Sequence, residues 1–168
     1  LRGHKGREWD GGLRVPAVLC WKGRFAEGVR SEQLAAFVDM APTIAALVGA
    51  GEPPRPYDGV NLLPALTGET ASFPRDLYLG CGAAVSGDCK LILKGGSRAM
   101  QLKSDYLVYY PEDAYEAQNR IEEHAAEAER LRRYIIRYDT IRPAHPELPY
   151  GQGKEGFKAP AEWRVTKP

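Results

Sequence analysis

A short basic stretch near the start of the chain contains the side chains best suited to chemistry. Lys5 lies between Gly3 and Gly6 and directly follows His4. Glycine lets the backbone approach a ligand closely, and a lysine ammonium is a compact point charge that attracts anions such as sulfate or phosphate. By itself the pattern is short, and a glycine-flanked basic turn in solvent is its commoner structure. The stretch is therefore a candidate anion site.

The other candidates for chemistry have plainer structural explanations. The three cysteines, Cys20, Cys81 and Cys89, have the spacing of neither a metal site nor a redox pair. His124 lies among glutamates on the polar side of an expected helix, where a solvated histidine is sufficient explanation. Tyrosines between positions 106 and 110 alternate along an expected strand, and they suit either a sugar-binding face or, more simply, sheet packing.

Composition excludes several classes of protein. The 168 residues are 43% hydrophobic and 27% charged, as in ordinary globular domains. The formal net charge of +1 provides no global field for nucleic acid, and no run approaches the about 20 apolar residues of a membrane-spanning helix. The sequence begins at Leu1 in a glycine-rich loop without a visible signal peptide, so we expect it to continue a longer protein.

The first part of the chain predicts a strand followed by a helix. Residues 13–21 are apolar, include two β-branched valines and follow a double glycine, which favours a buried strand. Asp39 is placed to cap a helix that accepts Pro42 in its first turn and ends at Gly49 or Gly51. The buried stripe of this helix is expected from three residues at helical spacing: Ile44, Leu47 and Val48.

The later part predicts a small antiparallel sheet and one long helix. Apolar or aromatic runs at residues 76–80, 83–93 and 100–110 are separated by turn residues, with tight turns expected at 86–88 and 95–97. Apolar residues then recur at intervals of three and four from Ile121 to Tyr138, which is typical of an amphipathic helix. A stretch rich in proline and glycine follows from residue 142 and predicts a tail without regular structure.

Three ordered motifs resemble the sulfatase family. In its first motif a lysine precedes an aromatic residue, an acid, two glycines and Arg-Val-Pro. The matching residues here are Lys5, Trp9, Asp10, Gly11, Gly12, Arg14, Val15 and Pro16. FVDMAPTIAALVGA is similar to the family's Asp-x-x-Pro-Thr helix, and YDGVNLLPALTGE is similar to its Asp-Gly-x-x-Leu-x-Pro-x-Leu-x-Gly.

Two weaker motifs extend the resemblance, and three positions depart from it. AVSGDCKLIL resembles the family's C-terminal strand ending in Lys-Leu-Ile, and DAYEAQNRI resembles its Asp-Pro-x-Glu-x-x-Asn-Leu turn. Lys22 stands where the family commonly has proline, Asp10 where it has glutamate, and Ala114 where it has the proline of the late turn. These departures leave the implied fold intact and are typical of a divergent subfamily.

The resemblance implies an α/β fold, a truncated sandwich of the alkaline-phosphatase-like type with a small C-terminal antiparallel sheet packed by a long helix. Residues 1–72 would be the C-terminal part of the catalytic α/β domain. Residues 73–141 would be the small C-terminal subdomain, and residues 142–168 the tail.

The resemblance also implies the C-terminal portion of a type I sulfatase, which hydrolyses sulfate esters with a formylglycine nucleophile and a calcium ion. Lys5 would contact a sulfate oxygen and the ester oxygen. His4 matches no catalytic position of the family and would shape the loop, and Asp10 would belong to a structural turn. None of the cysteines lies in the formylglycine motif, and the calcium-ligand motif would precede Leu1. The chain alone is therefore expected to be inactive.

The implied partners are a sulfated small molecule or sulfated glycan and the missing N-terminal part of the same enzyme, with neither nucleic acid nor a membrane span. Two alternatives stay open: a related phosphoryl or phosphonate hydrolase, and a non-catalytic binding or interaction module derived from a sulfatase. Localisation is left open by the residues, and only the family resemblance favours a periplasmic or secreted protein.

Overall fold

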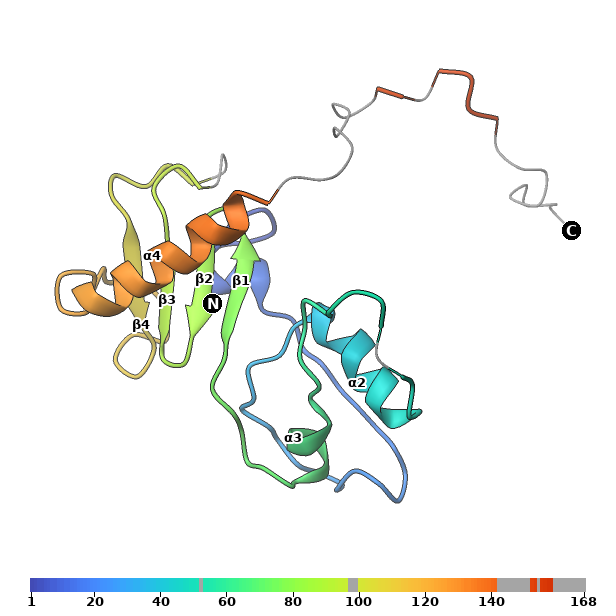
Figure 1. The fold of residues 1–168 in the computed structure, drawn as a ribbon. Helices are drawn as coiled ribbons and strands as arrows, with labels where there is room; N and C mark the ends of the chain where they lie inside the picture. Colours follow the sequence, from blue (N-terminus) through green and yellow to red (C-terminus); the bar gives the residue numbers. More distant parts are fainter. Residues whose placement is uncertain (52, 97–99, 142–151, 154, 159–168) are drawn as a thin grey trace, which may run out of the picture.

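The computed structural model contains a four-stranded antiparallel sheet that is crossed by one long helix (Figure 1). The structure describes residues 1–51, 53–96, 100–141, 152–153 and 155–158. The strands are β1 (Asp76–Gly80), β2 (Ala83–Ser86), β3 (Cys89–Ile92) and β4 (Tyr106–Tyr109). The helices are α1 (Asp10–Leu13), the 3₁₀ turn η1 (Phe37–Asp39), α2 (Met40–Leu47), α3 (Leu63–Thr67) and α4 (Ala125–Asp139).

The sheet confirms the strands and turns expected from the apolar runs. Its strands follow one another in chain order, β1-β2-β3-β4, and each pairs antiparallel with the next. Ser86 pairs with Cys89 across the turn between β2 and β3, where Gly87 has a φ of 51°. A two-residue hairpin turn needs this left-handed conformation, which glycine adopts at little steric cost. The predicted turn at 95–97 lies partly outside the described residues.

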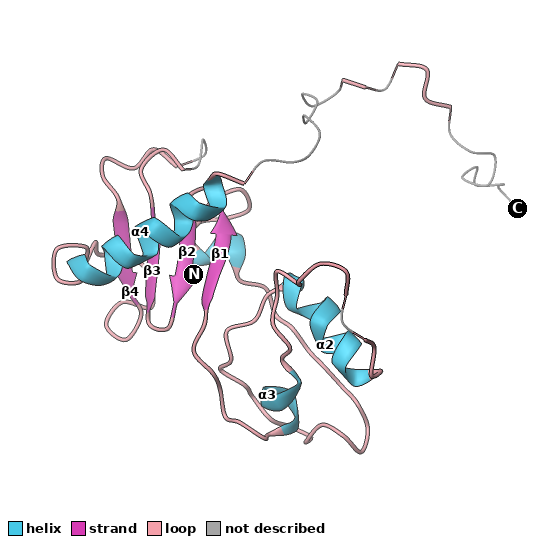
Figure 2. Cartoon of the chain, in the orientation of Figure 1, coloured by secondary structure: helices cyan, strands magenta, loops and turns pink. Residues whose placement is uncertain are grey.

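Helix α4 covers one face of the sheet, as Figure 2 shows. Leu131 and Ile135 of the helix are fully buried against Leu91 of β3 and Leu107 of β4. The helix begins at Ala125 rather than at Ile121, because the preceding residues form a loop fixed to the sheet. There the Asn119 side-chain oxygen accepts hydrogen bonds from the backbone N–H groups of Leu107 and Ile121.

The opposite face of the sheet is covered by the N-terminal segment rather than by a helix layer. Trp9 is buried there with Ile92 and Val108 from the sheet and with Met100. The segment that carries Lys5 therefore packs directly on the sheet of residues 76–109, although the two are more than sixty positions apart in sequence. The division of the chain near Ser72 stays a prediction.

The strand expected at residues 13–21 is not formed, and that prediction is wrong. Leu13 ends the helical turn α1, and residues 14–21 have no regular secondary structure. Val15 is 79% exposed and Val18 is 90% exposed. An extended apolar segment becomes a buried strand only beside another strand, and within the described ranges the sheet consists of β1 to β4 alone. The small sheet with its long helix is thus confirmed, whereas this strand of the larger sandwich is absent.

Helix α2 is confirmed, but its predicted buried stripe is wrong. Pro42 and Thr43 are buried, whereas Ile44 is 57% exposed and Val48 is 72% exposed. The stripe was expected to pack on the strand at 13–21, which is not formed. The helix instead contacts the segment that follows it, where the Thr43 hydroxyl oxygen accepts a hydrogen bond of 2.9 Å from the backbone N–H of Leu62.

Asp39 connects three segments through a fully buried carboxylate. One oxygen accepts hydrogen bonds from the backbone N–H of Ala36 (2.7 Å) and from the Arg75 guanidinium (2.6 Å). The other accepts one from the backbone N–H of Val60 (2.9 Å). Asp39 is the N-cap of α2, as predicted, yet its side chain makes no capping hydrogen bond and holds the surrounding loops together instead.

No helix in the described part of the chain has the length and apolar character needed to cross a membrane. The predicted tail from residue 142 onward lies almost entirely outside the described residues.

Candidate anion site on the N-terminal loop

Lys5 lies at the turn of a loop that is closed by its own backbone. The Gly11 N–H donates to the carbonyl oxygen of Arg2 over 2.7 Å, and the Arg7 N–H donates to that of His4 over 3.1 Å. Gly3 and Gly6, on either side of the lysine, have φ values of 78° and 85°. The left-handed backbone conformation at these two positions therefore requires glycine, because other residues rarely adopt it.

The double glycine allows this loop to close, because the closed loop leaves no room for a side chain at position 11 or 12. A Cβ atom on Gly11 would lie 2.5 Å from the carbonyl oxygen of Arg2. One on Gly12 would lie 2.1 Å from the carbonyl oxygen of Arg7. Both distances are far below van der Waals contact, so the Gly-Gly pair is a packing requirement of the loop that presents Lys5.

We expect Gly12→Ala to destabilise the protein by about 1–3 kcal/mol, because the new methyl group must displace backbone rather than a flexible side chain. Urea denaturation measures the change. Gly51→Ala is the matched control, since no described atom lies within 4 Å of its added Cβ, and it should shift stability by less than about 0.5 kcal/mol. Equal effects of the two substitutions would contradict the packing role of Gly12.

The two site residues predicted from the sequence, Lys5 and His4, are both exposed and adjacent. The Nδ1 atom of His4 lies 3.1 Å from the carbonyl oxygen of Lys5, so the imidazole contacts the loop backbone. Within the described residues the Lys5 ammonium has neither a hydrogen bond nor an ion pair. The lysine is therefore available to an anion that approaches from solvent.

Both arms of the loop are anchored by an aromatic contact. The Arg2 guanidinium carbon lies 3.7 Å from the centre of the Trp9 ring, a cation–π distance. The Trp9 ring packs edge-on against Tyr106 of β4, with 5.0 Å between ring centres. A nitrogen of Arg2 also donates a hydrogen bond to the carbonyl oxygen of Glu116. The loop is thus held against the sheet region by Arg2, three residues before Lys5, and by Trp9, four residues after it.

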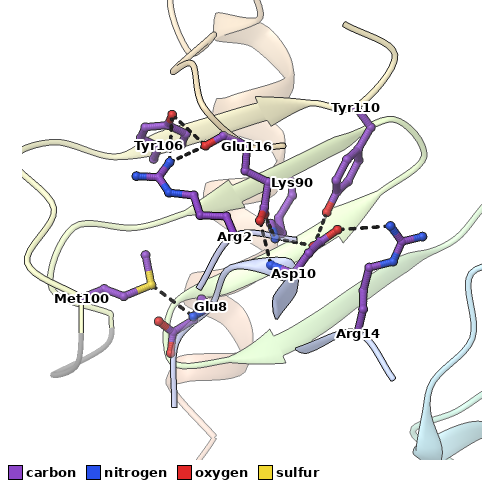
Figure 3. A network of polar contacts seen from close by, with 9 residues as sticks. All are labelled: Arg2, Glu8, Asp10, Arg14, Lys90, Met100, Tyr106, Tyr110 and Glu116. Atoms are coloured by element: carbon purple, nitrogen blue, oxygen red, sulfur yellow. Dashed lines mark hydrogen bonds and ion pairs between the residues drawn. The ribbon is translucent and has the colours of Figure 1, made fainter. Parts of the chain in front are cut away.

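A buried cluster of charged groups lies under the loop (Figure 3). The Lys90 ammonium, on β3, lies 2.7 Å from Asp10 Oδ1 and forms a second ion pair with Glu116. The Tyr110 hydroxyl donates to the same Asp10 oxygen over 2.8 Å. The Asp10 backbone N–H donates to Glu116 Oε2 over 2.8 Å. Lys90, Asp10 and Glu116 are almost completely buried, and we call them the buried triad.

Comparison with known proteins finds similar segments in curated sulfatases. No family model matches the chain. It is 48% identical to arylsulfatase A of Bos taurus over 75 residues, and this match covers 45% of this chain and 14% of that protein. It is 42% identical over 71 residues to arylsulfatase G of Rattus norvegicus, covering 42% and 14%. To the steryl-sulfatase of the same organism it is 37% identical over 87 residues, covering 51% and 15%. Over these segments, which make up 42% to 51% of its length, the chain is similar to sulfatases.

The chain spans only 14% to 15% of the length of those curated relatives. One similar solved structure is described as "Metabolism of multiple glycosaminoglycans by bacteroides thetaiotaomicron is orchestrated by a versatile core genetic locus". It has a TM-score of 0.49 and 18% identity, and the match covers 61% of this chain and 24% of that one.

The buried triad unites three segments that resemble sulfatase motifs and are distant in the sequence. Asp10 comes from Trp-Asp-Gly-Gly, Lys90 from Cys-Lys-Leu-Ile and Glu116 from Asp-Ala-Tyr-Glu. Sequence reasoning assigned Asp10 to a structural turn and did not single out Lys90 or Glu116. A signal was present, because a lysine inside an apolar strand is almost never buried without a partner of opposite charge.

Burial and polar contacts set the protonation states of Asp10 and Tyr110. Burial acts to raise the pKa of the Asp10 carboxyl, but the hydrogen bond and charge of Lys90 and the Tyr110 hydroxyl outweigh it. The pKa of Asp10 therefore lies below its ordinary value of 3.8. Burial, together with the Asp10 carboxylate, raises the pKa of Tyr110 above its ordinary value of 10.0. At neutral pH Asp10 is thus an ionised acceptor and Tyr110 a protonated donor.

The described part of the chain contains no group of three or more histidine, cysteine, aspartate or glutamate side chains that would hold a metal ion. All three cysteines are free thiols. Burial raises the pKa of the Cys89 thiol, which favours its unreactive protonated form.

A separate cavity of about 580 Å³ lies between β1 and the C-terminal end of α4. None of its described lining residues belongs to the loop that carries Lys5. The rings of Tyr78 and Tyr138 stack there with 5.1 Å between centres, and the Tyr78 hydroxyl donates to Asp139. The Tyr134 hydroxyl donates to the Asp76 carbonyl oxygen. These two hydroxyl donors are already used inside the protein.

Proposed function

We propose that this chain supplies the sulfate-binding lysine of an enzyme that hydrolyses sulfate esters. The observation that carries the proposal is the presentation of Lys5. Its ammonium is exposed, has no partner among the described residues and lies on a loop anchored at both ends. The curated relatives are named arylsulfatases and a steryl-sulfatase, which supports a sulfate ester as the substrate class.

In the proposed reaction Lys5 contacts a sulfate oxygen and the oxygen that links sulfur to the leaving group. Negative charge develops on that linking oxygen as the S–O bond breaks, and a fixed positive charge stabilises the transition state more than the ground state. His4 maintains the loop through its contact with the Lys5 carbonyl oxygen and takes no part in proton transfer. The substrate is a sulfated small molecule or a sulfated glycan.

The nucleophile and the calcium ligands belong, in this proposal, to the remaining N-terminal part of the same enzyme. Formylglycine and calcium would supply the attacking oxygen and hold the sulfate. Large apolar side chains that remain exposed support a contact with that part, because removing apolar surface from water favours association. They lie between positions 15 and 48 and include Val15, Val18, Val29, Phe37, Ile44 and Val48.

The test compares the 168-residue chain with the same chain joined to a sulfatase segment that carries the formylglycine motif and the calcium ligands. We expect the joined protein to release sulfate from an aryl sulfate and the chain alone to show no turnover, because it lacks the nucleophile. Turnover by the pure chain would contradict the assignment of the nucleophile to the other segment.

Two further outcomes of the same assay separate the alternatives. Hydrolysis of an aryl phosphate or phosphonate in preference to the sulfate would identify a phosphoryl or phosphonate hydrolase. A joined protein that is folded, calcium-loaded and correctly modified, yet inactive on all three esters, would favour a non-catalytic binding module.

A further inference from the structure

We infer that the buried triad of Lys90, Asp10 and Glu116 positions Lys5 for the reaction, acting through the loop rather than on the substrate. The inference rests on the proposed function of Lys5. It assigns a role to Lys90 and Glu116, neither of which lies near Lys5 in the sequence or carries any role in the reaction as proposed above.

Glu116 holds both ends of the Lys5 loop. Its carbonyl oxygen accepts a hydrogen bond from the Arg2 guanidinium, three residues before Lys5. Its carboxylate accepts one from the backbone N–H of Asp10, five residues after Lys5. The Arg2 carbonyl oxygen accepts a hydrogen bond from the Gly11 N–H, and this bond joins the two ends of the loop. Glu116 therefore holds Arg2 and Asp10, the two ends of the loop that carries Lys5, at a fixed separation.

Lys90 fixes the orientation of this arrangement. Its ammonium bridges the carboxylates of Asp10 and Glu116, and β3, which carries it, is hydrogen-bonded on both sides within the sheet. Tyr110 adds a second donor to the Asp10 oxygen that Lys90 contacts. The backbone of Asp10 is thereby bonded to Glu116, and its side chain to Lys90 and Tyr110 (Figure 3).

Stability alone is a poor explanation for this cluster. Taking a lysine and two carboxylates out of water is costly, and well-packed apolar residues often serve stability equally well or better. Hydrogen bonds and ion pairs, in contrast to apolar contacts, require specific directions. A misplacement of about 1 Å at a reacting group can lower a rate by about 10², so a loop that presents one ammonium benefits from directional anchoring.

The experiment is a double-mutant cycle in the joined, active protein. We expect Lys90→Met to lower kcat/KM for an aryl sulfate by roughly 10-fold to 100-fold, mainly through kcat, at a temperature where the variant is fully folded. In a Lys5→Ala background the same substitution should change kcat/KM by less than about threefold, because the ammonium that it positions is gone. A merely structural lysine would lower the rate by the same factor in both backgrounds.

Lys94→Met is the matched control, because Lys94 is exposed and its side chain has no described partner. If Lys5→Ala lowers the rate but Lys90→Met equals this control, the positioning role is wrong and the proposed function stands. If Lys5→Ala itself has no effect, the proposed function fails first. Should Lys90→Met not fold, Tyr110→Phe replaces it, with an expected drop of about 3-fold to 10-fold that again vanishes without Lys5. An equal drop in both backgrounds would overturn the inference.

Discussion

Replacement of Lys5 by alanine in the joined enzyme is expected to lower kcat/KM for a sulfate ester by roughly 10² to 10³. The exposed ammonium, which has no described partner to lose, would act mainly on the charge that develops in the transition state. The loss should therefore appear largely in kcat rather than in KM. Steady-state kinetics with an aryl sulfate, alongside melting temperatures of both proteins, measures the effect.

Two neighbouring substitutions sharpen this prediction. Lys5→Arg should recover only part of the rate, because a planar guanidinium does not occupy the place of a compact ammonium. His4→Ala should cost less than Lys5→Ala, since His4 contacts only the loop backbone in the described structure. A Lys5→Ala variant that melts like the parent and keeps kcat/KM within about threefold, under ~1 kcal/mol, would make this segment a scaffold.

Asp39→Ala is expected to destabilise the protein by about 3–5 kcal/mol. The substitution leaves the Arg75 guanidinium, whose side chain is 7% exposed, without its buried ion-pair partner. It also removes the acceptor for the backbone N–H groups of Ala36 and Val60. Urea denaturation of the purified protein, followed by circular dichroism, gives the change in the free energy of unfolding.

The exposed ion pair between Arg30 and Glu32 provides the control for Asp39. Glu32→Ala should change stability by less than about 1 kcal/mol, because both side chains are largely in water. Asp39→Asn should fall between the two, since it keeps one acceptor oxygen and loses the charge. If Asp39→Ala is no more destabilising than Glu32→Ala, Asp39 does not hold the three segments together.

Elements that depend on local periodicity were predictable from the sequence. The alternating runs from residue 76 to 110 became β1 to β4, and the spacing from Ile121 to Tyr138 became α4. In both cases the apolar side of an element faces another element of the same sequence region. The information about the burial of Leu91, Leu107 and Leu131 was therefore contained in the pattern itself.

Elements that depend on a partner outside their own region were predicted incorrectly. Residues 13–21 have the composition of a buried strand, and Ile44 and Val48 have the spacing of a buried helix face. Residues 14–21 are irregular and Ile44 and Val48 are exposed, because no described strand lies beside residues 14–21. An apolar composition indicates that a segment is suited to burial. It does not indicate whether another element of the chain lies beside the segment to bury it.

The sequence by itself determined the sulfatase motifs, the candidate Lys5 and the need for glycine around it, because each follows from residue types within a few positions. Only the tertiary structure decided what holds that lysine in place. Asp10 meets Lys90 across 80 positions and Glu116 across 106. No periodicity relates residues so far apart: their contact follows from the N-terminal segment packing on the sheet, which places three charges where water is excluded and makes them pair with one another.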